Sequence, residues 1–383
     1  STRTDTKLEI QHQTRLSSLD NYIDQFARID LSEISDEEQR ILNLVHNGNI
    51  EVVLEAYENL GLISKLNSEA ATYQVLNVSV KAIQEEIGQR KSNIDALYES
   101  IQRQLSAFHL ADKKKESEDL LLSLLETIAP LYEKEPEYYR AKYAKTLLQL
   151  GELSSSDSRS LEYLSKAVEE YEILFSKNPD IFLPEFSYAN YQLGCFYRAR
   201  LDDVNAEKYL LSADKHYTTL YQHDPDKYAH QLAWIKSLLG ELFTLNNRTH
   251  EAVAFYLETL EILEPFIEKK PSVLNLYSET LLHLGNLYDK TQSFVKAEDS
   301  YLKGLTYIKQ SALDDFEQQG KLVRIIQRQI GEFYTKTLHD ATKAGVFFQE
   351  EDLFYMNLIN SLSGLFKNDP EKYGHILATV LDN

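Results

Sequence analysis

The chain has 383 residues, of which 43% are apolar, enough to bury a large core. Its 60 acidic and 40 basic residues give a net charge of −20, and charge of this sign repels DNA, RNA and anionic lipid. We therefore expect no nucleic-acid partner, although a basic protein partner would be attracted. No apolar run is long enough to span a membrane, and with one cysteine, Cys195, no internal disulfide can form.

The N-terminal part of the sequence predicts helices with short breaks. Residues 5–29 form one predicted helix, because their apolar residues recur at steps of three and four. Ser35 and Glu38 match the capping box that begins a helix, and residues 41–60 predict a helical hairpin turned at 47–49. Alternating strand patterns are absent from the sequence. The chain is therefore predicted to be all-α.

A single long helix is predicted from about residue 68 to residue 110. One position of its heptad is apolar throughout, and a second is interrupted by Arg90 and Gln104. The first position holds Tyr73, Val80, Ile87, Ile94, Ile101 and Phe108. Such a seam must be covered, because each exposed Ile or Leu forgoes about 1.5–3 kcal/mol.

Two partners are available for that seam. One is the set of N-terminal helices, which would form a small bundle with it, and the other is a second copy of the chain. A symmetric dimer would place Arg90 and Gln104 opposite their own copies. We therefore favour intramolecular packing and a monomer, with a homodimer through residues 73–108 as the alternative.

Beyond residue 135 the sequence repeats with a period of about 45 residues. A Leu-Gly or Ile-Gly step recurs, and successive glycines are 43, 46, 45 and 46 residues apart. An aromatic residue follows four of the glycines by three positions, and an alanine follows three of them by twelve. The glycines are Gly151, Gly194, Gly240, Gly285 and Gly331, the aromatics Tyr197, Phe243, Tyr288 and Tyr334, and the alanines Ala206, Ala252 and Ala297. Such a period indicates stacked copies of one unit.

Each unit predicts two helices. Apolar residues recur at helical spacing in 185–199 and again from 204 to about 221, and Pro225 ends the second helix. Gly194 lies inside the first helix, where glycine costs about 1 kcal/mol relative to alanine. Because every unit bears this cost, we expect the two helices to cross at the glycine, with no room for a Cβ.

The unit resembles the tetratricopeptide repeat. The matching residues are Leu193, Gly194, Tyr197, Ala206, Leu210, Ala213 and Pro225. The family has a period of 34 residues, so this chain would be a long-helix variant. The resemblance implies an α-α superhelix of five helix pairs. A weaker unit that ends at Pro136 lacks the glycine and is expected to cap the array.

We therefore expect four regions. The first, 1–66, holds the N-terminal helices and the hairpin. The second, 67–135, holds the long helix and the capping repeat. The five helix pairs occupy 136–371, and 372–383 form a C-terminal tail.

The N-terminal segment carries a second resemblance. Residues 19–33 and 36–41 are similar to a segment of bacterial multidomain proteins in which a secreted β-sandwich module precedes a helical repeat region. This implies a bacterial cell envelope or periplasmic location, with the cytoplasm as the alternative. The chain begins at Ser1 and its one methionine is Met356, so we expect it to be part of a longer polypeptide.

Motifs for catalysis are missing. The sequence contains no nucleophile elbow, no glycine-rich phosphate loop and no H-E-x-x-H. His216, His223 and His230 are spaced by seven residues, but Pro225 breaks the helix between them. We expect neither an enzyme, nor a cofactor, nor a metal site.

The tetratricopeptide resemblance implies one candidate site, a concave groove lined by the first helix of each pair. The inward positions are six and three before each glycine, and one and four after it. In the first unit they hold Lys145, Leu148, Glu152 and Ser155. The residues expected to bind a peptide are Tyr188, Tyr191, Arg198, Trp234, Glu241, Asn286, Asp289 and Arg328.

Aromatic anchors are the central part of this hypothesis. Tyr188, Tyr191 and Trp234 would be at least partly exposed in the groove and would bury against a partner. The alternative is that the long helices bury these rings between repeats.

The sequence therefore predicts a non-catalytic scaffold that takes an extended peptide or a helix into its groove. The alternative is a signalling regulator. In that case a bound peptide would change the pitch of the superhelix and control an effector held by the N-terminal helices.

Overall fold

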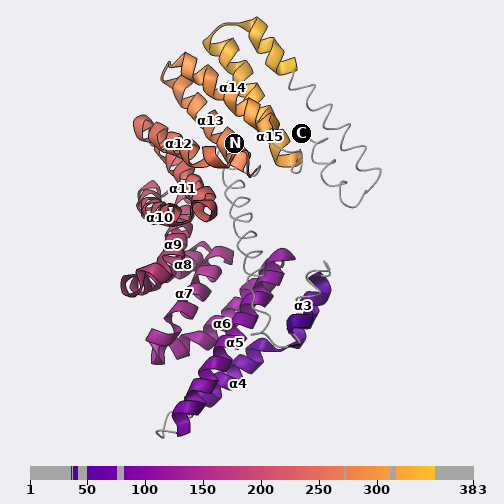
Figure 1. Cartoon of the computed structure of the whole chain (residues 1–383), viewed down its shortest axis with the longest axis vertical. Coiled ribbons are helices and arrows are strands. Elements are labelled where there is room, and N and C mark those ends of the chain that lie inside the picture. The colour runs from indigo at the N-terminus through magenta and orange to yellow at the C-terminus, as the bar shows by residue number, and fades with distance from the viewer. Residues whose placement is uncertain are drawn as a thin grey trace. The chain divides into compact units, whose positions relative to one another are not determined.

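The structure is a computed structural model of the chain (Figure 1). It describes residue 36 and residues 38–41, 50–75, 82–270, 273–310 and 316–349. The regular secondary structure in these ranges is helical throughout, which confirms the all-α prediction. The predicted helix at 5–29, the hairpin turn at 47–49 and the tail at 372–383 lie outside the described residues.

From α5 to α12, consecutive helices are joined by short turns. The N-terminal helices are α3 (Ile50–Asn59), α4 (Leu62–Val75), α5 (Ala82–Leu110) and α6 (Lys114–Lys134). They are followed by α7 (Pro136–Leu153), α8 (Asp157–Lys177), α9 (Pro179–Ala199), α10 (Asp203–His223), α11 (Pro225–Leu245) and α12 (Thr249–Leu263). After η1 (Glu264–Phe266) come α13 (Val273–Lys290), α14 (Phe294–Gln310), α15 (Phe316–Glu332), the π-helical η2 (Phe333–Thr337) and a helix at 341–349.

Helices pack in consecutive pairs, as the tetratricopeptide resemblance implies. Helix α7 packs on α8, α11 on α12 and α13 on α14. The chain divides into two compact units, 1–209 and 210–383. Prolines expected to end each pair in fact begin the next one, since Pro136, Pro179 and Pro225 lie in the first turns of α7, α9 and α11. Proline suits that position because its missing N–H has no intrahelical acceptor there.

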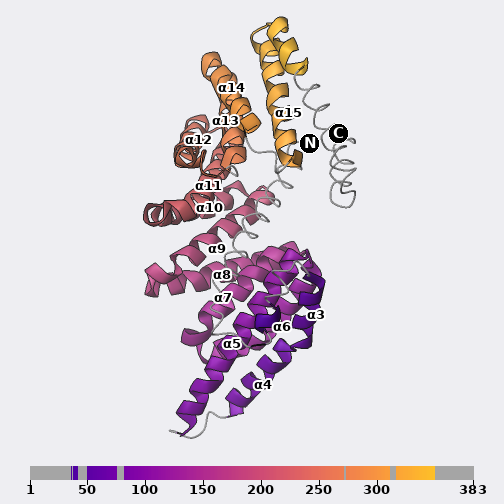
Figure 2. The same cartoon turned by 45° about the vertical axis from the view of Figure 1, so that its right-hand side comes forward.

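The prediction of one long helix from residue 68 to residue 110 is wrong. Helices α4 and α5 are separate and lie side by side (Figure 2). Arg90 Nη1 of α5 lies 2.6 Å from Glu69 Oε2 of α4. These two residues would be about 30 Å apart in one straight helix. Arg90, which interrupts the seam in the sequence, thus joins two packed helices.

The apolar seam of α5 is buried within the chain. Ile94 and Ile101 are fully buried and Phe108 is 3% exposed. Helix α5 contacts α3, α4 and α6. Of the N-terminal helices expected to cover the seam, α3 lies within the predicted hairpin, whereas the predicted helix at 5–29 lies outside the described residues. The prediction that the seam residues find an intramolecular partner is therefore confirmed.

Helix α5 is also hydrogen-bonded to α7, the first helix of the repeats. The amides of Gln102 and Gln149 exchange hydrogen bonds of 3.2 and 2.9 Å. The Tyr98 hydroxyl donates to the carbonyl of Lys142 at 3.1 Å. The N-terminal helices are thus fixed to the first helix pair by polar contacts as well as by packing.

The first helices of several pairs end in the same left-handed turn. Leu201, Asn247 and Gln292 have φ values of 63°, 56° and 59°. In each case the next backbone N–H donates to the carbonyl of the recurring aromatic residue, which is the bonding pattern of a Schellman cap. These bonds are Asp202 to Tyr197 (3.1 Å), Arg248 to Phe243 (2.8 Å) and Ser293 to Tyr288 (2.7 Å).

Helix α5 ends in that turn too. Asp112 has a φ of 51°, and the Lys113 N–H donates to the Phe108 carbonyl at 2.9 Å. Helices α5 and α6 therefore share the repeat's turn, as expected for the weaker unit that ends at Pro136.

The irregular spacings have local causes. Helix α7 ends two residues after Gly151, whereas α9 ends five residues after Gly194, which accounts for the short interval of 43. At the other end, η2 inserts one residue, so Ala344 follows Gly331 by thirteen positions and is 2% exposed. A single π-helical turn is a known way to absorb one extra residue.

The glycines lie where the two helices of a pair cross. A Cβ on Gly240 would lie 2.6 Å from the Tyr256 ring, which is fully buried. The glycines Gly151, Gly285 and Gly331 face Leu164, Tyr301 and Phe348 at similarly short range. The predicted steric reason for these glycines is confirmed.

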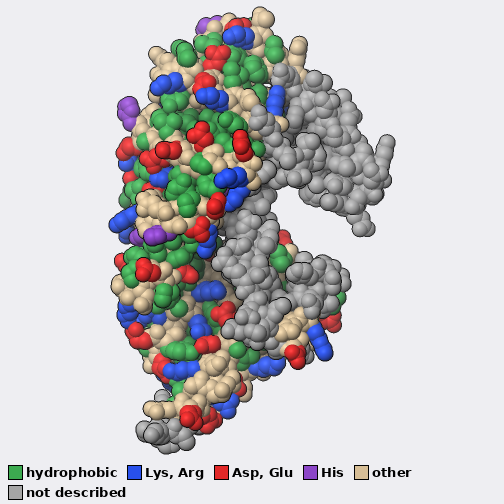
Figure 3. All heavy atoms as spheres, viewed as in Figure 1, with side chains coloured by type: hydrophobic (Ala, Val, Ile, Leu, Met, Phe, Trp, Pro, Cys, Tyr) green, Lys and Arg blue, Asp and Glu red, His purple; other side chains and the backbone are tan. Residues whose placement is uncertain are grey.

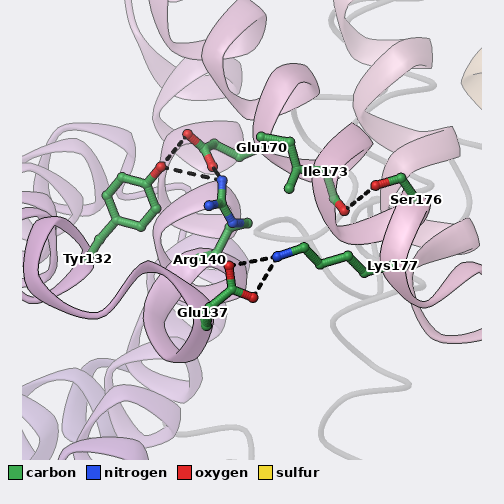
Figure 4. Close-up of polar contacts among 7 residues, drawn as sticks. All are labelled: Tyr132, Glu137, Arg140, Glu170, Ile173, Ser176 and Lys177. Carbon is green, nitrogen blue, oxygen red and sulfur yellow. Dashed lines mark hydrogen bonds and ion pairs between the residues drawn. The ribbon is translucent and has the colours of Figure 1, made fainter.

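Figure 4 shows a buried polar network and an exposed ion pair on the same helices. Arg140 of α7 pairs with Glu170 of α8, and both side chains are about 90% buried. The Tyr132 hydroxyl of α6 donates to Glu170 Oε1 at 2.7 Å. Nearby, Lys177 Nζ and Glu137 Oε2 are 2.6 Å apart but largely exposed. The buried network therefore fixes α6, α7 and α8 together.

We predict opposite effects for alanine at two glycines. Gly240→Ala should cost about 1–3 kcal/mol of unfolding free energy, because the buried Tyr256 ring cannot retreat. Gly88→Ala, on the exposed side of α5 with no atom near the new Cβ, should instead gain about 0.5–1 kcal/mol. Denaturant unfolding measures both. An increase in unfolding free energy for Gly240→Ala would contradict the close approach of the two helices at Gly240.

Arg140 offers a second stability test. Arg140→Leu should destabilise the fold by about 3–5 kcal/mol, because it leaves Glu170 buried without its cation. Lys177→Leu, which breaks the exposed pair, should change the unfolding midpoint little. Equal effects in thermal unfolding would show that burial of the Arg140 pair is unimportant.

Candidate functional site

Unit 1 contains three of the predicted peptide-binding residues, all on α9. Tyr188 is half-buried, whereas Tyr191 is 5% and Arg198 6% exposed. The rings of Tyr188 and Tyr191 are 6.0 Å apart and tilted by 38°. The prediction that Tyr191 is an accessible anchor is wrong, because its ring is packed into the helix array. Tyr188 keeps an accessible side.

In unit 2 the chain's tryptophan is buried. Trp234 of α11 is 8% exposed. The prediction that this ring is partly exposed is therefore wrong, and the alternative, that the long helices bury it, is correct for Trp234. Its neighbour in sequence, Lys236, is also buried, with Nζ 2.8 Å from Asp214 Oδ1 and 2.6 Å from Glu258 Oε2. Both carboxylates raise the pKa of Lys236 and outweigh the lowering by burial. This cluster joins α10, α11 and α12.

The other predicted residues of unit 2 contact different neighbours. Glu241 Oε1 lies 3.7 Å from His283 Nε2. Asn286 is exposed and accepts a 2.8 Å hydrogen bond from the Tyr301 hydroxyl. The structure thus spreads these residues along α11 and α13 and does not gather them into one site.

Asp289 and Arg328 are the remaining two. Asp289 Oδ2 accepts a 3.4 Å hydrogen bond from Thr337. Arg328 is exposed and its Nε lies 3.3 Å from Glu332 Oε1. Asp289 lies on α13 and Arg328 on α15.

Helix α7 carries two groups that the list of expected binding residues omitted. Lys145 and Glu152 lie seven residues apart, so two turns of helix place them on the same face. Both side chains are half-buried. Both residues are at positions predicted to face inward, six before and one after Gly151, but their surroundings are known only from the structure.

The environment of Glu152 opposes ionisation. Burial raises the pKa of Glu152 to about 8, and a hydrogen bond with Tyr188 only partly offsets it. Gln192 Nε2 donates to the Tyr188 hydroxyl at 2.5 Å. Burial raises the pKa of the Tyr171 phenol of α8 well above 10, and the charges of Glu185 and Glu152 act in the same direction. At neutral pH Glu152 is therefore mostly a neutral acid, able both to donate and to accept.

Burial also disfavours the charged form of Lys145. Burial lowers the pKa of Lys145, while Glu99 of α5 and Glu185 of α9 oppose the change. Lys145 and Glu152 are thus both partly accessible, and burial disfavours the charged form of each. We call Lys145, Glu152, Tyr171, Glu185 and Tyr188 the Glu152 cradle.

The cradle provides hydrogen bonding and charge rather than a nucleophile. Burial raises the pKa of the Cys195 thiol on α9 to about 11, so it remains protonated. Within the described ranges, no group of three His, Cys, Asp or Glu side chains could hold a metal ion. Nor does any helix there combine the length and apolarity needed to cross a membrane. On the face drawn in Figure 3, acidic and basic side chains are mixed with hydrophobic ones, so charge alone marks no site there.

Comparisons with known proteins leave the function open. No protein-family model matches the chain, and no curated protein matches it. Among solved structures it is similar to BtubC (BKLC) from P. vanneervenii, with 20% identity over 60% of this chain and 91% of that one, and a TM-score of 0.38. The apo quorum sensor NprR from B. thuringiensis shows 13% identity over 99% of both chains, with a TM-score of 0.45. A Rap protein complexed with Competence and Sporulation Factor shows 15% identity over 88% of this chain and 98% of that one, with a TM-score of 0.38.

We predict that Glu152→Gln changes how stability depends on pH. The folded pKa is about 8 and the ordinary value is 4.5, so the folded state holds the proton more tightly. The stabilisation from that proton is complete below about pH 4.5 and is lost as the pH rises to about 8. The glutamine of the variant cannot ionise. The unfolding free energy of the variant relative to the parent should therefore increase across this window by an amount on the order of a few kcal/mol.

Denaturant unfolding at pH 5, 7 and 9 measures this advantage. Glu172→Gln, at an exposed position of α8, is the control and should show no such growth. If the unfolding free energies of the Glu152→Gln variant and the parent differ by the same amount at all three pH values, the carboxyl of Glu152 is not held neutral by burial.

Proposed function

We propose that the chain is a non-catalytic scaffold that binds a peptide segment of a partner protein, with the Glu152 cradle as part of the binding face. The observation that carries this proposal is the pair of half-buried groups on α7, Lys145 and Glu152, whose charged forms are both disfavoured by burial. Groups buried only for packing are usually apolar or fully paired. Perturbed titratable groups gather at functional sites.

The chemistry of the cradle suits a peptide backbone. A neutral carboxyl and a tyrosine hydroxyl can each donate and accept, as the alternating N–H and C=O groups of an extended chain require. The Tyr188 ring adds a flat apolar surface beside them. An enzyme would need further reacting groups, and none of the recognised motifs supplies them.

The alternative, a peptide-responsive regulator, is favoured by two contacts between α5 and α7. The Gln102–Gln149 amide pair and the Tyr98–Lys142 hydrogen bond fix α5 to α7, within a turn of both Lys145 and Glu152. A peptide that moved α7 would therefore also move the N-terminal helices. A change in small-angle scattering on peptide binding would support this alternative.

The binding proposal predicts peptides whose affinity depends on the cradle. A displayed library of random 12-residue peptides is selected on the full chain. Tyr188→Ala and Lys145→Ala should each weaken the selected peptides on the order of tenfold, because they remove contacts at the centre of the site. Ile181→Ala, at a 64% exposed position of the same helix as Tyr188, is the control. Recovery of no peptide, or of peptides indifferent to both cradle variants, would contradict the proposal.

A further inference from the structure

We propose that the Glu152 cradle is the seat of a basic side chain, lysine or arginine, of the bound peptide, and that Glu152 is its counter-ion. This inference rests on the proposed function and adds the chemical class of the ligand. It follows from the other glutamates of the repeat, from the cations around α7 and from the end of that helix.

Three repeats place a glutamate directly after the glycine. Glu241 Oε1 lies 3.7 Å from His283 Nε2. Glu332 has Arg328 Nε at 3.3 Å and Lys336 Nζ at 2.9 Å. Glu152 has no ion pair with a residue that the structure describes. The chain thus gives basic neighbours to two of these carboxylates and leaves the third for a cation from elsewhere.

The basic residues of α7 are engaged by other carboxylates. Arg140 pairs with Glu170, and Lys142 Nζ lies 2.8 Å from Asp95 Oδ1. Lys145 is influenced by two acids, one from α5 and one from α9. None of these cations is therefore directed at Glu152.

The position of Glu152 in its helix favours a cation as well. Helix α7 ends at Leu153, and its last turn contains no basic residue. The carbonyl end of a helix carries partial negative charge, which stabilises a nearby cation and disfavours a carboxylate. A bound ammonium or guanidinium would satisfy both the carboxylate and the helix end.

The side chains around Glu152 are suited to such a guest. The half-buried Tyr188 provides a hydroxyl and an aromatic face, to which cations are attracted. On the helices packed against α7, the charged or titratable groups that act on Lys145 or Glu152 are Glu99 of α5 and Glu185 and Tyr188 of α9. Two cations of α8 contact other residues of α7, since Lys166 lies over the Tyr143 ring and Lys177 pairs with Glu137. The groups that act on Lys145 and Glu152 from the packed helices are therefore acids, which favours a positive ligand.

Binding of the cation would release a proton. The free site holds a protonated carboxyl, and the bound state holds a carboxylate beside the ammonium or guanidinium, so the proton passes to the buffer. Affinity should rise with pH and level off above about pH 8, where the free carboxyl is already ionised.

The test uses the peptides selected on the full chain. Those that depend on Tyr188 should be enriched in Lys or Arg. Glu152→Gln should weaken them on the order of tenfold, while Glu172→Gln, at an exposed position, should not. Calorimetry of one arginine peptide at pH 7, in buffers of different ionisation enthalpy, should show release of roughly one proton. Replacing its arginine by the neutral isostere citrulline should abolish that release.

The outcomes separate the two proposals. Peptides that depend on Tyr188 but lack basic residues, or that bind the Glu152→Gln variant equally well, overturn this inference and leave the proposed function standing. Binding without proton release overturns the counter-ion role. Recovery of no peptide at all overturns both.

Discussion

The close approach of two helices at each glycine is the constraint on which the rest of the structure depends. At Gly240 the neighbouring helix comes so near that a Cβ would collide with the Tyr256 ring. Glycine costs about 1 kcal/mol in a helix interior, but the crossing buries a whole tyrosine side chain, which returns more. Because the crossing fixes the rotation of the first helix, positions counted from the glycine acquire a defined direction. Lys145 and Glu152, six before and one after Gly151, share a face for this reason.

The crossing also explains where the repeat can vary. Helix α7 ends earlier after its glycine than α9 does, and η2 contains one residue more. Both changes lie at the end of a first helix, beyond the crossing. A residue added or removed there shifts the turn without rotating the helix against its partner. In both cases the small buried residue of the second helix is retained, with Ser160 in the shorter unit and Ala344 in the longer one. The sequence showed these units only as departures in spacing, since a π-helical turn has no sequence signal of its own.

The periodic features of the fold could be predicted from the sequence, but its tertiary environments could not. The glycines, the aromatic caps and the proline starts recur at fixed spacing, so their roles follow from position. The error between residues 68 and 110 has a physical reason. An antiparallel hairpin can continue the apolar pattern of one helix, and the sequence of 76–81 contains no glycine or proline to indicate a turn. Tyr73 and Ile94 are both buried, although they lie in different helices.

The same distinction applies to the candidate site. Counting from the glycine placed Trp234 on an inner face, yet its exposure depends on how closely the next helix packs, and that distance is not encoded in the spacing. Glu152 lies at an inward position by the same count, but nothing in the sequence distinguishes it from the other glutamates that follow a repeat glycine. What distinguishes Glu152 is the combination of a desolvated carboxyl with the lack of an ion pair to any described residue. A fold selected for stability alone would place an apolar or paired residue there, as it does at most other buried positions. An ionisable group in that setting destabilises the fold as the pH rises. Such a loss of stability is typical of residues that are kept for binding or another function.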